Sequence, residues 1–238
     1  YLDLHCGGID NAFPHHTNEI AQSEAYLGHP WCKYWMHVHH LNTNHGKMSK
    51  SSGEFLTVSL LEEKGYDPLV YRFFCLQSHY RKSLIFSWEN LDNAKTAYDK
   101  LVSRVAALSD DPAPVDEAAA AKYKAAFIEA VGNDLNTSLG VTALYDVLKA
   151  DVNDATKRAL IGSFDQVLGL DLLEKAAALR EKASAPAEGA EEIEALITQR
   201  LEAKKAKDWA KADAIRDQLK AMGVEIKDSK EGTTWTRV

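Results

Sequence analysis

Apolar residues recur along this chain at helical spacing over most of its length, and strand-like runs are confined to a few short segments. The clearest helix is expected at residues 88–108, where apolar positions alternate in steps of three and four. They are Leu91, Ala94, Tyr98, Leu101, Val105 and Leu108. This spacing is typical of a seam in a helix bundle. Similar patterns predict helices at residues 18–25, 56–64, 68–77, 117–131, 138–149 and 154–168.

The first residues predict half of an α/β unit. Residues 1–4 form a strand-like run that feeds a Gly-rich turn at residues 5–8, ahead of the first helix. A lone strand needs neighbours for its backbone groups, so we expect the natural protein to be longer, with its N-terminal part absent here. Residues 34–42 predict a second strand, and residues 43–53 a polar, basic loop.

The C-terminal part predicts a separate small unit. Residues 181–189 have the composition of a linker. Beyond it we expect a helical hairpin at residues 191–205 and 209–222, ended by Gly223, and then a β-hairpin at residues 224–227 and 233–237. The expected fold is therefore mainly α, with α/β segments at both ends.

Composition limits the class of protein. The chain has 238 residues, enough for one large domain or two to three small ones, and 45% of them are apolar. No apolar run approaches the ~20 residues that span a bilayer, and no signal segment opens the chain. Three widely spaced cysteines favour a reducing, cytoplasmic setting over a disulfide framework.

The charge is unevenly distributed. The net charge is −7, which argues against a nucleic-acid binder that is basic throughout. Residues 199–220 nevertheless carry seven basic and four acidic side chains, a local excess of positive charge. This segment is either a phosphate-contacting surface or an ordinary solvated helix face.

The sequence Lys-Met-Ser-Lys-Ser at residues 47–51 is the first motif that carries chemistry. It resembles the KMSKS signature of class I aminoacyl-tRNA synthetases, whereas a lysine-rich surface loop is the alternative. The resemblance makes Lys47, Ser49, Lys50 and Ser51 candidate catalytic residues. When a carboxylate attacks the α-phosphate of ATP, two lysines on such a loop can stabilise the developing negative charge.

Residues 5–22 form the second motif, His-Cys-Gly-Gly-Ile-Asp followed by Phe-Pro-His-His-Thr-Asn-Glu-Ile-Ala-Gln. The motif resembles the H-x-GG-x-D-x-x-FPHH-x-NE-IAQ segment of cysteinyl-tRNA synthetases. The resemblance implies that His15 and Glu19 are zinc ligands, and residues i and i+4 do share a helix face. It also implies two further cysteine ligands before Tyr1. Cys6 and Thr17 depart from the family pattern.

The same resemblance implies an amino-acid and nucleotide pocket. His5 would line the cysteine pocket, and Gly7 and Gly8 would let the backbone approach the adenylate. Asp10 would orient the ribose or the amino group. A Trp-Met-His run at residues 35–37 resembles the family strand before the KMSKS loop, which places His37 near the adenylate together with Lys50.

The C-terminal unit resembles the anticodon-binding end of the same family. The pattern runs from Arg200 through Lys-Asp-Trp at residues 207–209 to Gly-Thr-Thr-Trp at residues 232–235. An aromatic face, basic groups and carboxylates suit single-stranded RNA. The candidate anticodon contacts are Lys204, Trp209, Asp213, Arg216 and Asp228. Trp235 is more readily explained as a core residue, and residues 133–137 resemble a structural D-F-N-T element.

The resemblance implies a domain plan and a function. Residues 1–53 would end a Rossmann-like catalytic domain, 54–87 would form a stem-contact-type connector, 88–180 a helical bundle, 181–190 a linker and 191–238 an anticodon-binding domain. The full-length protein would be a monomeric cysteine–tRNA ligase that uses zinc, with Mg-ATP, cysteine and cysteine tRNA as substrates and no membrane contact. The chain itself lacks the H-x-G-H motif of class I synthetases and is expected to be inactive alone.

Two other functions remain open. A cysteine ligase of the mycothiol pathway shares the catalytic fold and zinc chemistry, but it ends without an anticodon-binding domain. A tRNA-binding module without activity is the alternative from a different class of protein.

Overall fold

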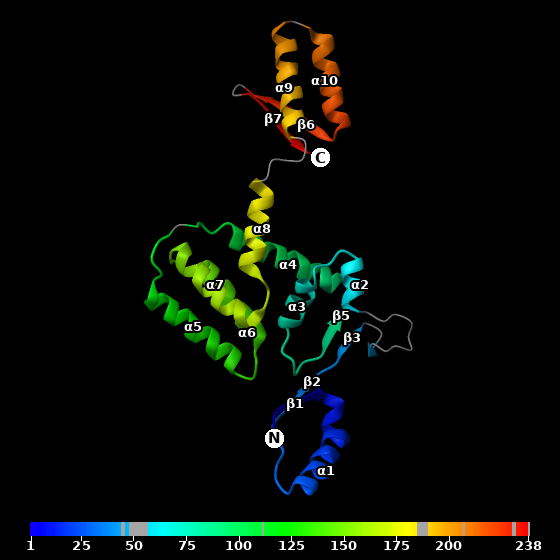
Figure 1. Ribbon diagram of the computed structural model, residues 1–238, viewed down its shortest axis with the longest axis vertical. Helices are drawn as coiled ribbons and strands as arrows, with labels where there is room; N and C mark the ends of the chain where they lie inside the picture. The colour runs from blue at the N-terminus through cyan, green and yellow to red at the C-terminus, as the bar shows by residue number, and fades with distance from the viewer. Residues whose placement is uncertain are drawn as a thin grey trace. The chain divides into compact units, whose positions relative to one another are not determined.

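The computed structural model describes residues 1–43, 46–47, 57–110, 112–184, 190–206, 208–229 and 232–237. The chain divides into two compact units, Tyr1–Arg180 and Glu181–Val238 (Figure 1). Helices dominate the described residues and the sheets are small, which confirms the mainly α fold class. Among the helices described, none combines the length and apolar character needed to cross a bilayer.

The first unit opens with a strand–helix–strand element. Strand β1 (Leu2–Gly8) pairs in parallel with β2 (Cys32–Val38), and helix α1 (Thr17–Leu27) connects them. Two short helical segments, η1 (Ile9–Asn11) and η2 (Ala12–His16), lead from β1 into α1. Helix α1 ends at Gly28, which has a positive φ of 74° and donates its amide to Glu24.

Two sequence predictions about these strands are wrong in detail. Residues 5–8 do not form the expected turn, because β1 continues to Gly8 in register with Val38 and the chain turns afterwards. The single strand predicted at residues 34–42 is two strands, β2 and β3 (Leu41–Thr43). The break falls at His39, whose amide donates to the carbonyl of Tyr80 at 2.9 Å.

A second sheet joins the strand region to the helices. Strand β3 pairs antiparallel with β4 (Gly46–Lys47) and parallel with β5 (Leu84–Phe86), which the sequence analysis did not predict. Helices α2 (Val58–Glu63) and α3 (Pro68–Leu76) lie between β4 and β5 in the chain.

The helical bundle is built largely as the apolar spacing predicts. It comprises α4 (Trp88–Ala106), α5 (Glu117–Gly132), α6 (Thr137–Lys149) and α7 (Asp154–Leu168). Each of the four begins after a polar residue whose side chain accepts an amide hydrogen bond from the first turn. The predicted seam of α4 is buried in a core shared with Phe73, Leu144 and Phe164.

Helix α8 (Leu172–Ser184) corrects the sequence prediction for the linker. Residues 181–184 are helical, and residue 190 already belongs to α9, so both ends of the expected linker at 181–190 lie in helices. The carboxylate of Asp165 accepts the amides of Leu170 and Leu172 at 2.7 Å, which starts α8 directly after α7. Leu172 and Ala176 are buried, whereas the exposed residues mix charged side chains with alanines and Leu179 and gave no apolar stripe.

The second unit is a helical hairpin with a β-hairpin. Helices α9 (Ala190–Lys205) and α10 (Trp209–Ala221) are followed by the antiparallel strands β6 (Val224–Ser229) and β7 (Gly232–Arg237). Gly223, with a φ of 71°, follows α10 as predicted. The core of this second unit contains Ile193, Leu196, Ile197, Ile215, Leu219 and Val224.

Candidate functional site

A group of histidines surrounds one carboxylate at the C-terminal end of β1 and the start of α1. His5, on β1, places its Nε2 3.1 Å from Oε2 of Glu19 on the first turn of α1. His16, the last residue of η2, bonds through Nδ1 to Nε2 of His37 on β2 at 2.8 Å. The parallel pairing of β1 with β2 brings residues 5 and 37 to this site.

His16 is the buried member of the group. Its side chain is almost inaccessible, with 3% of the residue exposed. Burial, followed by the nearby His5 and His37 rings, lowers the pKa of His16 below its ordinary value of 6.5. The ring is therefore neutral at physiological pH, which is the protonation state that a metal ligand requires.

Gly7 gives the His16 ring its space. A Cβ at position 7 would lie 2.7 Å from Cε1 of His16, closer than real side-chain contacts allow. A Cβ at Gly8 would instead lie 2.5 Å from Oδ1 of Asp10, whose side chain is exposed. Asp10 also lies 3.2 Å from Nε2 of His40. The two glycines therefore bring backbone and polar side chains close together at the edge of the site.

The geometry includes a set of potential metal ligands. One ligand atom from each of His5, His16 and Glu19 lies within 4.8 Å of the others. Two imidazoles and a carboxylate fit zinc, which takes N and O donors with room for a further ligand. His15, the histidine expected as a ligand, is 70% exposed, and its Nε2 lies 3.8 Å from Oε2 of Glu19.

Sequence reasoning thus missed His16. The signal was present, because His16 stands three residues before Glu19 and shares its helical face no less than His15 does. Aromatic rings complete the surroundings: the Trp35 and His5 rings are nearly perpendicular with their centres 4.9 Å apart, and the Trp31 ring centre lies 5.7 Å from that of His5.

The lysine-rich motif is only partly within the described residues. Lys47 ends β4, with its backbone opposite Asn42 of β3. Ser49, Lys50 and Ser51 lie outside the described residues, as does the side chain of Lys47. Their proposed roles rest on the sequence.

The candidate RNA-contacting residues of the second unit lie on α9, α10 and β6. Trp209 opens α10 and is 61% exposed, so its ring is available to a ligand. On the same helix, Arg216 lies 3.3 Å from the carboxylate of Asp213. Lys204 belongs to the last turn of α9. Asp228 lies on β6 opposite Thr233, but its side chain is outside the described part, as is that of Trp235.

Comparison with known protein families gives two matches, one near each end of the chain. Residues 1–96 match the family described as the class I (C) tRNA synthetase catalytic domain, and residues 186–235 match the cysteinyl-tRNA ligase anticodon binding domain. A cysteine–tRNA ligase of Burkholderia lata is 42% identical over 97% of this chain, and one of Methylococcus capsulatus is 41% identical over 100% of it.

The chain belongs to the cysteine–tRNA ligase family.

This member of the cysteine–tRNA ligase family spans about half the length of the curated relatives it matches, 47% for the Burkholderia protein and 53% for that of Methylococcus. A solved LeuRS of Agrobacterium radiobacter K84, in a ternary complex with tRNA and LeuAMS, has a TM-score of 0.52 at 15% identity. That likeness covers 78% of this chain and 28% of the LeuRS, and it shows a shared fold.

Proposed function

We propose that this chain supplies part of a cysteine–tRNA ligase, which activates cysteine with ATP and transfers it to cysteine tRNA. The observation that carries the proposal is that matches to a catalytic and an anticodon-binding domain stand at opposite ends of one chain. Within it we propose a catalytic part at 1–53, a connector at 54–87, a bundle at 88–180, a linker at 181–190 and an anticodon-binding domain at 191–238, although the catalytic-domain match itself extends to residue 96.

The histidine cluster would hold zinc and the substrate side chain. Glu19 is the carboxylate ligand in this proposal, with His15 as the ligand implied by the family pattern and His5 and His16 beside it. Bound zinc would accept the cysteine thiolate as a ligand and lower the pKa of the thiol. Serine has a hydroxyl that binds zinc poorly at neutral pH, so this contact distinguishes the two amino acids.

The other residues of the site act on charge and position. His5 and His37 shape the pocket for cysteine and its adenylate, Gly7 and Gly8 let the backbone approach, and Asp10 orients the ribose or the amino group. Lys47 and Lys50, with Ser49 and Ser51, stabilise the charge that develops on the phosphates as the cysteine carboxylate attacks.

Recognition of tRNA belongs to the second unit in this proposal. Trp209 offers an exposed stacking surface, Lys204 and Arg216 offer positive charge, and Asp213 and Asp228 are acceptors for base amino groups. A mycothiol-pathway ligase is disfavoured because residues 186–235 match an anticodon-binding domain.

The deciding experiment is cysteine-dependent exchange between ATP and pyrophosphate by the full-length gene product, followed by aminoacylation of cysteine tRNA. We expect activity with cysteine and little with serine. Lys50→Ala should lower the exchange rate far more than it raises the KM for cysteine. A full-length protein that binds tRNA but shows no exchange with cysteine would support the non-catalytic alternative instead.

The 238-residue chain is the matched comparison. We expect no exchange above background, because the H-x-G-H motif is not among its residues. We also expect zinc binding to be weak, because the two cysteine ligands that the family resemblance implies are not among its residues. A stoichiometric zinc signal after dialysis would show that other groups, such as His5 and His16, complete the coordination sphere.

A further inference from the structure

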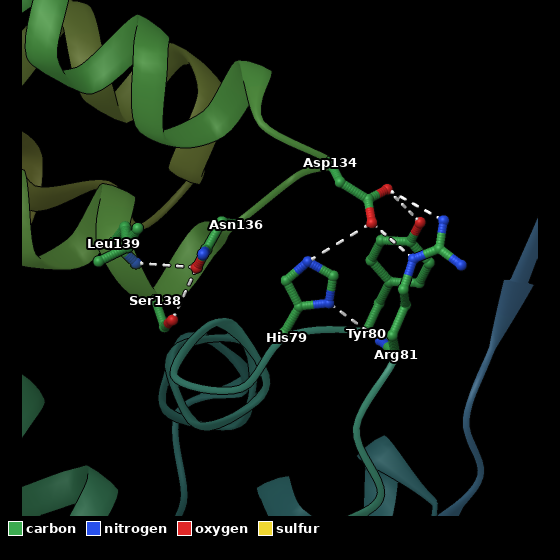
Figure 2. Close-up of polar contacts among 7 residues, drawn as sticks. All are labelled: His79, Tyr80, Arg81, Asp134, Asn136, Ser138 and Leu139. Carbon is green, nitrogen blue, oxygen red and sulfur yellow. Dashed lines mark hydrogen bonds and ion pairs between the residues drawn. The ribbon is translucent and has the colours of Figure 1, made fainter.

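One carboxylate in the helical bundle gathers three consecutive side chains from a distant segment. Figure 2 shows Asp134, in the turn between α5 and α6, facing His79, Tyr80 and Arg81. The Tyr80 hydroxyl donates to Oδ1 at 2.5 Å, and Arg81 Nε donates to Oδ2 at 2.5 Å. Nε2 of His79 lies 3.8 Å from Oδ2. The hydrogen bonds from Arg81 and Tyr80 hold the pKa of Asp134 below its ordinary value, which keeps the carboxylate ionised.

The three side chains are also held against one another. The His79 and Tyr80 rings stack at 4.8 Å, and the Arg81 guanidinium lies 5.1 Å from the centre of the Tyr80 ring. The amide of Arg81 donates to Nδ1 of His79 at 3.2 Å. Asp134 therefore binds three side chains that also contact one another, so one carboxylate can hold the whole segment.

The backbone that carries Asp134 is strained in a way that aims its side chain. Asp134 and Leu135 have φ values of 56° and 54°, a conformation that is uncommon for residues with a Cβ and rare for leucine. Asn136, next in the chain, caps α6 through the amide of Leu139 (Figure 2). Such strain persists where surrounding contacts fix the backbone, and it often marks a constrained position.

The segment bound by Asp134 supports the strands that lead to the Lys-Met-Ser-Lys-Ser motif. The carbonyl of Tyr80 accepts the amide of His39, just after β2. The chain then forms β5, which pairs with β3, and Asn42 of β3 donates to the Ser83 hydroxyl at 2.7 Å. Because β3 also pairs with β4, this short path connects Asp134 to the backbone of Lys47.

Apolar packing does not close the space between these strands and the bundle. A cavity of about 380 Å³ lies there, with Met36 and Leu41 on the strand side and Leu135 and Thr137 on the bundle side. Where side chains leave such a space, dispersion contacts across it are lost. Leu41 and Leu84 of these strands pack against the core, and the polar contacts of Asp134 add a second, separate connection beside the cavity.

We propose that Asp134 is a positioning residue for the activation step, which holds residues 79–81 and through them strands β3 and β4. The proposal rests on the proposed function, because it assumes that Lys47 and its motif act on ATP. Asp134 touches no substrate in this proposal. It sets the position of the β4 backbone at Lys47.

The first arm of the test is independent of activity and uses the 238-residue chain. Asp134→Asn keeps the shape of the side chain but removes its charge and one of its acceptor oxygens. We expect faster amide hydrogen exchange in peptides covering residues 38–47 and 79–86, with residues 141–168 unchanged. Asp99→Asn is the matched control, because Asp99 also pairs with a basic residue, Lys95, on the exposed side of the bundle.

The second arm uses the full-length protein. Asp134→Asn should lower kcat for ATP–pyrophosphate exchange by about 10-fold to 100-fold, as small misplacements of catalytic groups do, with the KM for cysteine unchanged. Tyr80→Phe should have a smaller effect in the same direction. The double variant Arg81→Ala with Asp134→Ala should be no worse than the worse single variant, since both act through one contact.

The outcomes separate the two proposals. Equal acceleration of exchange in residues 141–168 would give Asp134 a general structural role and overturn its positioning role. Unchanged exchange at residues 38–47 and 79–86 would overturn it as well. If the wild-type full-length protein fails to activate cysteine, the proposed function fails, while the exchange arm still decides whether Asp134 positions the strands.

Discussion

Gly7 is a residue whose function is to leave room. Its missing side chain lets the His16 ring lie against β1, so a single methyl group at this position competes with the most buried histidine of the cluster. A methyl group at position 7 would press on the His16 ring. This ring is held by its hydrogen bond to His37, so it cannot easily move aside. The histidine cluster therefore depends on the missing Cβ of Gly7 as well as on its donor groups.

We predict that Gly7→Ala displaces the His16 ring and breaks its hydrogen bond to His37. Proton–carbon NMR spectra of the histidine rings should show shifts for His16 and His37. Gly132→Ala is the control, because nothing lies within 4 Å of a Cβ built there. Unchanged ring resonances in Gly7→Ala would show that the site adapts to the methyl group.

Residue identities were predictable only where a sequence pattern names them. Glu19 and His5 were expected at the site, and the structure brings them together at 3.1 Å. His16 was missed because the family pattern points to its neighbour and because burial cannot be seen in a pair of adjacent histidines. Asp134 was missed as a contact because its partners are more than fifty residues away in the chain, and no local spacing records such a distance.

At the scale of elements, helix α3 shows how one carboxylate serves two elements. Asp67 caps α3 by accepting the amide of Leu69, and it also accepts a hydrogen bond from Lys175 of α8 at 2.5 Å. Partial burial would raise the pKa of the Asp67 carboxyl. The hydrogen bonds from Lys175 and Leu69 outweigh it and hold the pKa below its ordinary value of 3.8.

We predict an acid-dependent contribution of Asp67 to stability. Because its pKa is lower in the folded state, the contribution is present above the unfolded value and is lost as pH falls through the folded value. Asp67→Asn keeps a capping side chain but loses the charge. The Tm difference from wild type should therefore be largest near neutral pH and shrink below about pH 4. A difference that is constant from pH 7 to pH 3 would show that the pair with Lys175 contributes nothing.

Elements with strong apolar spacing were predicted well, and the others were not. The seam of α4 and the polar caps of α5 to α7 are local signals, so their bounds agree within two residues. Helix α8 has few buried positions and starts on a carboxylate from α7, a contact that only the folded chain contains. Strand β5 has three residues and depends on β3, which is more than forty positions away.

At the scale of the whole molecule, the chain combines two units with different chemistry. The first contains the histidine cluster and the bundle, and the second has an exposed tryptophan beside charged residues. If the second unit binds the anticodon, its contribution should be measurable in this chain without any catalytic step.

We predict that the 238-residue chain binds cysteine tRNA with a preference for the cognate anticodon. Trp209→Ala should weaken binding by ~1–3 kcal/mol with little dependence on base identity. Tyr26→Ala removes an even more exposed aromatic ring from the first unit and is the control. Asp228→Ala should reduce the preference for the cognate anticodon, whereas Lys204→Ala should weaken all tRNAs and lower the salt dependence. Affinities at two salt concentrations test this, and a wild-type chain without anticodon preference would contradict it.

The parallel pair β1–β2 has a practical consequence for anyone who handles this chain. Within the described residues the two strands have no further sheet neighbours, and Leu4 and Tyr34 are exposed on them. Parallel strands are normally covered on both faces, and open edges are templates for pairing with other chains. Aggregation through these strands should therefore lower the purification yield as the protein is concentrated. A soluble fusion partner attached close to Tyr1 would cover the open strand edges better than one attached at the C-terminus.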